Sequence, residues 1–296
     1  MPKPLASVVV VTFNRLALLQ GCLAALRRQT CPDFEIIVVN GASVDGTKDF
    51  LAKQSEIQVI NQLENRGLSE SRNAGIQAAK GEIVVFVDDD CVMDEGWLGK
   101  LLAPYADPGV AGVGGKVIGL PSRRVFFDHG GVDCFGIVQT LHAKSSAGFH
   151  PYLAGCNMSF RRSVLDVVGF FDEAFFLGYD ETDLCIRIQH AGYRLVFNDD
   201  AAICHHIHVE GKHDSHRFYW KARSRRLLMF KNFWDEIGWR RLLIFEVVNL
   251  WRNLYRFLAG CLGVRGRKPV SWAELWATLR GAWSGYGAGL RLLLVP

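Results

Sequence analysis

The chain has 296 residues, of which 49% are hydrophobic and 22% charged, so it can bury the core of one large domain or two medium ones. This composition excludes a chain that is disordered throughout. The net charge of +4 is unevenly spread, because residues 1–200 carry 18 Lys and Arg against 24 Asp and Glu, whereas residues 201–296 carry 16 against 6. The basic C-terminal part could meet phosphates, an anionic membrane or nucleic acid, and composition does not choose among them.

Strands and helices are predicted to alternate over the first hundred residues. Short apolar runs rich in β-branched residues predict buried strands at 7–11, 35–39, 57–60 and 83–87. Apolar residues at helical spacing predict helices at 16–28 and 69–79, and the turn 45–47 opens another helix. This alternation predicts βαβ units and a parallel sheet, so the residues that follow the strands should share one crevice.

The pattern changes beyond residue 105. Glycine-rich strands and loops are predicted for 105–160, and a helix for 181–190. After Ser215 the sequence is helical to its end. We therefore expect an α/β domain over residues 1–225 and a basic, amphipathic helical extension over residues 226–296.

Three aspartates, Asp88, Asp89 and Asp90, follow the fourth predicted strand. Carboxylates this close oppose folding unless a cation compensates their charge, and Mg²⁺ or Mn²⁺ bound together with substrate phosphates is the usual one. Alternate residues of an extended chain point to opposite sides, so we expect Asp88 and Asp90 to face the ligand and Asp89 to brace the turn. The alternative is a solvated acidic turn that caps a helix from Met93.

Six motifs follow one another in the first two thirds of the chain. They are V-V-V-V-T-F-N-R (8–15), V-V-N-G-A-S-V-D-G-T (38–47), E-N-R-G-L-S-E-S-R-N-A-G (64–75), F-V-D-D-D (86–90), A-G-C-N-M-S-F-R-R (154–162) and G-Y-D-E-T-D-L-C-I-R (178–187). Together they resemble glycosyltransferase family 2, and within it the bacterial surface-polysaccharide and rhamnosyl-type transferases. The resemblance covers residues 5–225 and implies a GT-A fold, which is a Rossmann-like nucleotide-sugar-binding domain, and an inverting transferase.

The resemblance also implies which residues bind the donor nucleotide. The residues that match its nucleoside-binding segments are Thr12, Phe13, Asn14 and Ser43. Asn40 stands where the family usually has an acid; an amide can still pair with a pyrimidine edge, which leaves uridine and thymidine open. Arg72 matches an arginine that reaches the donor, and Asp88 is expected on the donor side as well. The alternatives are core packing for Phe13 and a surface charge for Arg72.

An inverting transfer needs a carboxylate that takes the proton of the acceptor hydroxyl. The resemblance implies a base in the segment Asp180-Glu181-Thr182-Asp183, at the position of Glu181, with Asp180 as the second candidate. Asp183 is expected to cap the helix or bind backbone. The alternative is an acidic cluster that the helix dipole favours at an N-terminus.

Five histidines lie between residues 205 and 216. The resemblance implies that His205 joins Asp88 and Asp90 at the metal, with His206 as its rival. The other three, His208, His213 and His216, are expected to face solvent or to cap, and a zinc cage is a further alternative. On the acceptor side, the matching loop residues are Gly155, Cys156 and Asn157.

The C-terminal helices are predicted at 240–262 and 272–294. The first has a broad apolar surface and one narrow polar stripe, and the second mixes tryptophan with arginine. This pattern predicts in-plane binding to an anionic membrane surface, and the alternative is packing on the catalytic domain or on a second subunit. The sequence contains no run of about 18 uncharged apolar residues, so no membrane-spanning helix is predicted. We expect no signal peptide, because the N-terminus runs directly into a predicted strand. The eight cysteines contain no C-x-x-C pair.

These observations predict a cytoplasmic enzyme with reduced thiols, peripheral on the inner face of the cytoplasmic membrane. The expected reaction is metal-dependent, inverting transfer of a sugar from a UDP- or dTDP-sugar to a saccharide or polyprenyl-linked saccharide, with Mn²⁺ or Mg²⁺ as cofactor and no nucleic acid partner. One alternative is a sugar-phosphate nucleotidylyltransferase, although residues 12–15 are not its glycine-rich, lysine-containing loop. Another is a non-catalytic nucleotide-sugar-binding protein.

Overall fold

The computed structural model describes residues 3–140, 148–206, 215–261 and 271–294. The chain forms two compact units. The first, called the α/β unit here, comprises residues 1–131, 139–176 and 180–207; the second, called the helical unit, comprises residues 132–138, 177–179 and 208–296. The domain boundary expected after residue 225 falls inside one continuous helix, α7 (Ser215–Asn232), so the units divide the chain at other places.

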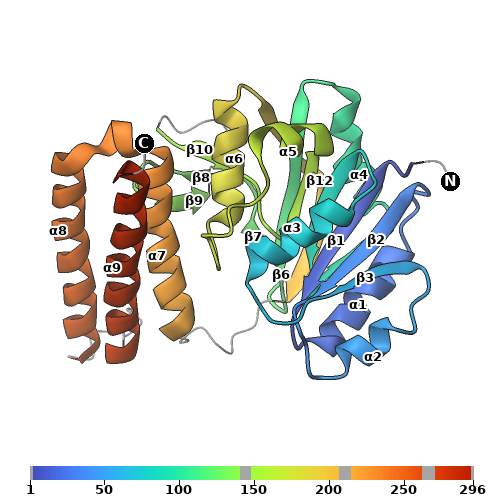
Figure 1. The fold of residues 1–296 in the computed structure, drawn as a ribbon, viewed down its shortest axis with the longest axis horizontal. Helices are drawn as coiled ribbons and strands as arrows, with labels where there is room; N and C mark the ends of the chain where they lie inside the picture. Colours follow the sequence, from blue (N-terminus) through green and yellow to red (C-terminus); the bar gives the residue numbers. More distant parts are fainter. Residues whose placement is uncertain (1–2, 141–147, 207–214, 262–270, 295–296) are drawn as a thin grey trace. The chain divides into compact units, whose positions relative to one another are not determined.

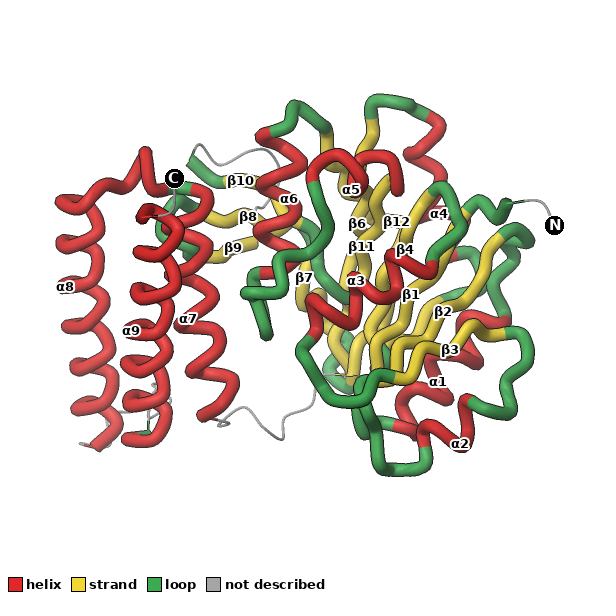
Figure 2. The backbone as a smooth tube through the Cα atoms, in the orientation of Figure 1, coloured by secondary structure: helices red, strands yellow, loops and turns green. Residues whose placement is uncertain are grey.

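A nine-stranded sheet forms the centre of the α/β unit (Figure 2). Its main order is β3-β2-β1-β4-β11-β6-β12-β5, and β7 pairs with β6. β1 to β4 pair in parallel, β11 runs antiparallel to β4 and β6, and β12 runs parallel to β6 and antiparallel to β5. The strands are β1 (Ala6–Thr12), β2 (Phe34–Asn40), β3 (Ile57–Asn61), β4 (Ile83–Asp88), β5 (Cys91–Met93), β6 (Val110–Leu120), β7 (Arg124–Phe127), β11 (Asn157–Arg161) and β12 (Arg194–His206).

Helices cover both faces of this sheet (Figure 1). On β1, Val8 and Val10 belong to a core that includes α1 and α4, whereas Val9 belongs to a core that includes α3, α5 and α6. The strands are therefore buried on both faces, as their continuous apolar runs predict. The helices of this unit are α1 (Leu16–Arg27), α2 (Thr47–Leu51), α3 (Leu68–Ala78), α4 (Trp97–Leu102), the 3₁₀ helix η1 (Ala103–Ala106), α5 (Arg162–Val168) and α6 (Asp180–His190).

The strand register places the polar strand ends side by side. Thr12 pairs with Asn40, Asn40 pairs with Asn61, and Asp88 lies beside Val11. The polar residues that end β1, β2, β3 and β4 therefore lie together at the carboxyl edge of the parallel strands, where such sheets bind ligands. No helix starts at Met93, because residues 91–93 pair as β5 with β12.

Three helices make up most of the helical unit. They are α7, α8 (Trp234–Cys261), which is interrupted at Gly238, and α9 (Trp272–Leu294), and they run side by side in Figure 1. Across the described part of the chain, no helix combines the length and the apolar character that crossing a membrane requires. A small separate sheet has the order β10-β8-β9, with β8 (Gly130–Val132), β9 (Val138–Thr140) and β10 (His150–Tyr152).

The contact between α3 and β1 provides a test of the packing. A Cβ on Gly75 would lie 2.3 Å from the Val9 Cγ1, so Gly75→Ala should lower the free energy of unfolding by about 1–3 kcal/mol. Gly21 on α1 has open space around its Cβ position, so Gly21→Ala should raise stability by up to about 1 kcal/mol. Urea denaturation measures both; equal effects of the two substitutions would contradict the packing described.

Candidate active site

Asp89 is the brace of the acidic turn that follows β4. The Thr12 hydroxyl donates to its Oδ2 at 2.7 Å, and the Arg15 Nη1 lies 3.2 Å from its Oδ1 and 3.1 Å from Asp90 Oδ2. Burial raises the pKa of Asp89 to about 6, although Arg15 and Thr12 act in the opposite direction. The protein therefore supplies part of the positive charge that this turn needs.

His205 reaches Asp90 because β12 runs antiparallel to β5. This pairing sets His205 opposite Cys91, and the His205 Nε2 lies 3.0 Å from Asp90 Oδ1. Burial acts to lower the pKa of His205, but the hydrogen bond to Asp90 and the nearby carboxylate charges outweigh it and raise the pKa. The His205 Nδ1 is buried and has no hydrogen-bond partner among the residues that the structure describes, so one ligating atom of this side chain is available there.

Arg72, on α3, joins three segments of the α/β unit. Its Nη1 donates to Asp180 Oδ2 at 2.5 Å, its Nη2 donates to the Gly155 carbonyl at 2.9 Å, and Nη2 also lies 3.5 Å from Asp88 Oδ1. The buried guanidinium packs against two phenylalanine rings, 5.4 and 6.0 Å from their centroids. Burial acts to lower the pKa of Arg72, but Asp180, Asp88 and Glu181 outweigh it and raise the pKa. This side chain is therefore a permanent cation in the interior, and not a surface charge.

The two carboxylates at the start of α6 have different surroundings. Asp180 is completely buried against Arg72, whereas Glu181 is partly exposed. Burial, followed by the negative charge of Asp180, raises the pKa of Glu181 well above its usual range. Asp183 is buried and pairs with Arg187 at 2.8 Å. Glu181 is thus the carboxylate of this segment that keeps exposed surface and no ion pair with Arg72 or Arg187.

Two loops after β1 and β2 are tied together by short hydrogen bonds. The Asn14 amide donates to the Ser43 hydroxyl at 2.9 Å, and the Val44 amide donates to Asn14 Oδ1 at 2.8 Å. Asn14 has a positive φ of 54°, and Phe13 beside it is 43% exposed. The exposed ring is not part of the core, so it is placed where a ligand can contact it.

Asn40 lies beneath these loops and is buried. Its Nδ2 donates to Asn61 Oδ1 at 2.9 Å, and its Oδ1 accepts the Ser43 amide at 3.0 Å. The amide is therefore engaged within the protein on both sides. Asn40 therefore holds the turn at Ser43 in place through the hydrogen bond from the Ser43 amide.

The loop at residues 155–157 faces Arg72 through its first residue. A Cβ on Gly155 would lie 2.9 Å from the Arg72 Nη2, so the absence of a side chain permits this contact. Cys156 is partly exposed, but Asn157 is completely buried. The Asn157 amide accepts from a tryptophan on α4 and donates to carbonyls on β6 and β12, so it ties three segments together.

Among the described residues, one group of three potential metal-ligating side chains lies with its ligand atoms within 4.8 Å of one another: Asp90, Cys91 and His205. Asp88 is outside this group, and its Oδ1 lies 3.5 Å from the Arg72 Nη2. The other histidines of the cluster are less central. The His206 amide donates to the Asp90 carbonyl at 2.9 Å, the ring of His216 accepts from Trp220, and His208 and His213 lie outside the described residues.

Arg15 is the residue that sequence reasoning missed. It belongs to the first motif, T-F-N-R, but no role was expected for it. The available signal was its position directly after a strand end in a sheet whose neighbouring strand ends in three aspartates. A basic residue at that point can reach them across the sheet edge.

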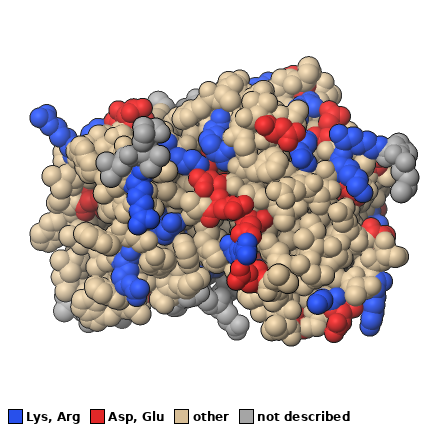
Figure 3. Space-filling view, viewed as in Figure 1, with Lys and Arg blue, Asp and Glu red and all other residues tan. Residues whose placement is uncertain are grey.

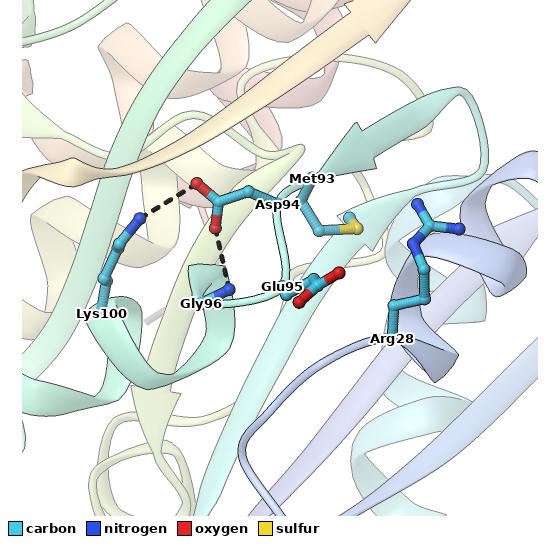
Figure 4. Close-up of a pocket in the computed structure, with 6 residues that line it drawn as sticks. All are labelled: Arg28, Met93, Asp94, Glu95, Gly96 and Lys100. Atoms are coloured by element: carbon cyan, nitrogen blue, oxygen red, sulfur yellow. Dashed lines mark hydrogen bonds and ion pairs between the residues drawn. The ribbon is translucent and has the colours of Figure 1, made fainter.

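A hollow of about 520 Å³ lies elsewhere on the α/β unit (Figure 4). Two of its charged groups pair with each other, because Asp94 accepts from the Gly96 amide and pairs with Lys100, both at 3.0 Å. None of the residues described above at the ends of β1, β2 and β4 lines it. It is therefore distinct from the candidate active site.

Comparison with known proteins identifies a matching family and similar proteins. A family model described as "Glycosyl transferase family 2" matches residues 7–169. The chain is 29% identical over 210 residues to Glycosyltransferase AglE of Haloferax volcanii, which covers 68% of this chain and 67% of that protein.

Two solved structures share the fold of the chain. The structure of GalNAc-T7 with UDP, GalNAc and Mn²⁺ has a TM-score of 0.63 at 19% identity, covering 79% of this chain and 48% of that one. Mannosyltransferase PcManGT of Pyrobaculum calidifontis, in complex with GDP-Man and Mn²⁺, has a TM-score of 0.59 at 19% identity, covering 99% and 79%. The chain thus spans about half the length of GalNAc-T7. These likenesses confirm the expected GT-A fold with C-terminal helices.

The buried Arg72 pair can be tested by mutation. Arg72→Met leaves Asp180 and Asp88 without their counter-charge, so it should lower the free energy of unfolding by about 3–5 kcal/mol. Arg66 pairs with Glu64 on the surface, so Arg66→Met should cost about 0–1 kcal/mol. Urea denaturation followed by circular dichroism compares the two variants. An Arg72→Met protein as stable as Arg66→Met would show that the buried pair is not structural.

Proposed function

The chain belongs to glycosyl transferase family 2, and from this premise we propose that it is a metal-dependent, inverting glycosyltransferase. The donor would be a UDP- or dTDP-sugar, and the acceptor a hydroxyl group of a saccharide or of a lipid-linked saccharide. The observation that carries the proposal is the position of Arg72, which contacts the donor-side Asp88 and the base-side Asp180 at once. One cation thereby joins the two halves of a transfer site.

The donor half is proposed at the ends of the first two strands. Phe13 is exposed there, and Asn14 and Ser43 hold the loops around it. A flat ring beside two polar turns suits the stacking and hydrogen bonding of a nucleoside base. Arg72 would reach the phosphate oxygens, since a guanidinium fork fits them well. Asn40 would act by keeping the Ser43 turn in place, and Thr12 by holding Asp89.

The residues at the acidic turn fit a hard divalent cation, Mn²⁺ or Mg²⁺. Asp90 and His205 offer an oxygen and a nitrogen within one small group, and the buried His205 Nδ1 has no partner. Burial raises the pKa of the third member, Cys91, well above its usual range, so its thiol stays protonated and is a poor ligand for such an ion. Asp88, whose side chain is 36% exposed, would join from the donor side. When bound, the cation would offset the charge on the departing diphosphate.

Glu181 is proposed as the general base. Its carboxylate would take the proton of the acceptor hydroxyl as that oxygen attacks the anomeric carbon, while the nucleoside diphosphate leaves from the opposite face. A carboxylate with a raised pKa is the stronger base once it is ionised. Asp180 pairs with Arg72 through its Oδ2 and would hold the start of α6 in position. Gly155 and Cys156 would line the acceptor side, with Asn157 anchoring their loop.

The same proposal includes attachment to an anionic membrane surface from the cytoplasmic side. The polar stripe of α8 is turned inward, because Glu246 pairs with the buried Arg226 on α7 at 2.8 Å and Asn249 is buried. The broad apolar face of α8 is exposed instead, with Trp251 at 68% exposure and Val247 one turn away. An amphipathic helix on the surface of a globular protein exposes its polar side to water, whereas α8 exposes its apolar side.

The charge of the helices favours an anionic surface. The described parts of α7, α8 and α9 carry 12 Lys and Arg against 4 Asp and Glu. On the face of the helical unit that Figure 3 shows, these basic side chains stand out from a largely uncharged surface. Tryptophan and leucine on the apolar side with arginine beside them is the composition of interfacial helices. Such attachment would suit a polyprenyl-linked acceptor.

Replacing the proposed base tests the catalytic assignment. Glu181→Gln should lower kcat about 10²–10⁴-fold, because the amide cannot take the proton. In the wild type, kcat should fall as the pH is lowered through the raised pKa of Glu181, since protonation removes the base. Initial rates of nucleoside diphosphate release between pH 5 and pH 9 measure both effects. Full activity of Glu181→Gln with loss in Asp180→Asn would assign the base to Asp180 instead.

Vesicle binding tests the membrane assignment. The full chain should co-sediment with phosphatidylglycerol vesicles, and Val247→Glu with Trp251→Glu should weaken this at least about tenfold by placing charge on the apolar face. Val167→Glu, at an exposed valine of the α/β unit, is the control and should bind as the wild type does. Failure of the wild type to co-sediment at moderate salt would contradict the assignment. So would a dimer in solution that the double variant dissociates, because the face would then bind a second copy.

A further inference from the structure

Two neighbouring arginines of α7, Arg225 and Arg226, are enclosed within the helical unit. They share a single carboxylate, that of Glu246 on α8. Arg226 Nη2 donates to both Glu246 oxygens, at 2.9 and 2.8 Å, whereas Arg225 Nη2 stays 3.9 Å from the nearer oxygen. The carboxylate is therefore used by Arg226, and the cluster of these three side chains has a surplus positive charge.

Within the described part of the chain, the enclosed donors of Arg225 have no hydrogen-bond acceptor. Its Nε and Nη2 are buried and unpartnered, and only 13% of the side chain is exposed. Burial, followed by the charge of Arg226, lowers the pKa of Arg225 to about 10. A buried hydrogen-bond donor without an acceptor costs free energy, and the cost is larger when the group is charged. The environment of Arg225 thus lacks an anion.

Aromatic rings and a glycine pack closely around Arg225. The ring of Phe245 lies 5.2 Å from the guanidinium carbon and is itself stacked on Phe135 at 4.5 Å. Gly136 approaches from the other side: a Cβ there would lie 2.6 Å from the Arg225 Cγ, so this approach requires glycine. The carbonyl of Gly136 accepts from the hydroxyl of Tyr179. The guanidinium is therefore held in one orientation by packing, which pre-organises its free donors.

We propose that Arg225 is an anion-binding residue of the helical unit, and that its ligand is a phosphate or diphosphate group. A guanidinium presents two parallel donors that match two phosphate oxygens, and Arg225 holds two such donors, Nε–H and Nη2–H, without partners. A phosphate here would neutralise the surplus charge of the cluster. The group could belong to free phosphate or to a lipid-linked phosphate.

This proposal is independent of the catalytic one, because all its residues lie in the helical unit. If the anion is the phosphate of a lipid-linked acceptor, it also specifies the acceptor class of the proposed function. Tyr179, which contacts the loop against Arg225, directly precedes Asp180 in the chain. An occupied site would thus lie against the segment that leads into the proposed base helix.

The test is titration of inorganic pyrophosphate into the full chain in EDTA, at constant ionic strength, followed by calorimetry and thermal unfolding. EDTA removes divalent cations, so binding at the nucleotide-sugar site that depends on such a cation does not contribute to the signal. The wild type should bind, and its Tm should rise with pyrophosphate. Arg225→Gln should weaken binding about tenfold or more, since one charged bidentate contact is lost. Arg217→Gln, at an exposed position of the same helix, should bind as the wild type does.

A second readout separates binding from a structural role. Without pyrophosphate, Arg225→Gln should be at least as stable as the wild type, because an uncompensated buried charge has been removed. Arg225→Lys, which keeps the charge without the fork, should bind more weakly than the wild type. A wild type that does not respond to pyrophosphate, or an Arg225→Gln protein that responds equally, would overturn the proposal.

The source of the phosphate is distinguished with vesicles. Phosphatidylcholine vesicles that contain a long-chain polyprenyl phosphate should displace pyrophosphate from the wild type if the ligand is lipid-linked, and vesicles without it should not. Binding of pyrophosphate without this competition would support the site and assign it to a free phosphate. Equal competition by both kinds of vesicle would show a surface effect of the bilayer and overturn the assignment to a phosphate site.

Discussion

The need to keep carboxylates charged at the end of a buried sheet governs the α/β unit. Asp88, Asp89 and Asp90 emerge where β4 leaves the core, and Asp180 is buried a short distance away. Arg72 pairs with Asp180 and lies near Asp88, and the burial of Arg72 and Asp180 is tolerable because each faces an opposite charge. Together with the apolar packing of α6, the Arg72 guanidinium therefore holds the start of this helix at the strand ends.

Positive charge is distributed unevenly along this edge. Arg15 pairs with Asp89 and Asp90, and His205 pairs with Asp90. Among the described residues, Asp88 has one ion pair, a longer contact of 3.5 Å with Arg72. The protein thus braces the turn without neutralising its charge completely. A divalent cation that arrives with a phosphate-bearing substrate could compensate the remaining negative charge. The helical unit shows the opposite imbalance, with donors in excess over acceptors.

The sequence was sufficient for the parts of the fold that local patterns encode. Continuous β-branched runs predicted β1 to β4, and the aspartates marked the edge where they end. The pairing that carries His205 to Asp90 could not be derived from local pattern, because it depends on β12 running antiparallel to β5, and His205 was named from a family resemblance. Whether the polar stripe of α8 faces inward or outward depends on the ion pair between Glu246 and Arg226, which is a contact between separate helices. Arg15 was overlooked because its partners lie about 75 residues further along the chain.

The central claim is that the acidic turn binds a nucleotide sugar together with a divalent cation. Calorimetric titration of UDP- and dTDP-sugars into the full chain, with Mn²⁺, Mg²⁺ or EDTA, tests it most directly. The account predicts that one of these donor classes binds, and that a divalent cation tightens its binding about tenfold or more. Binding that is equally tight in EDTA, or no binding of any donor with either ion, would contradict it.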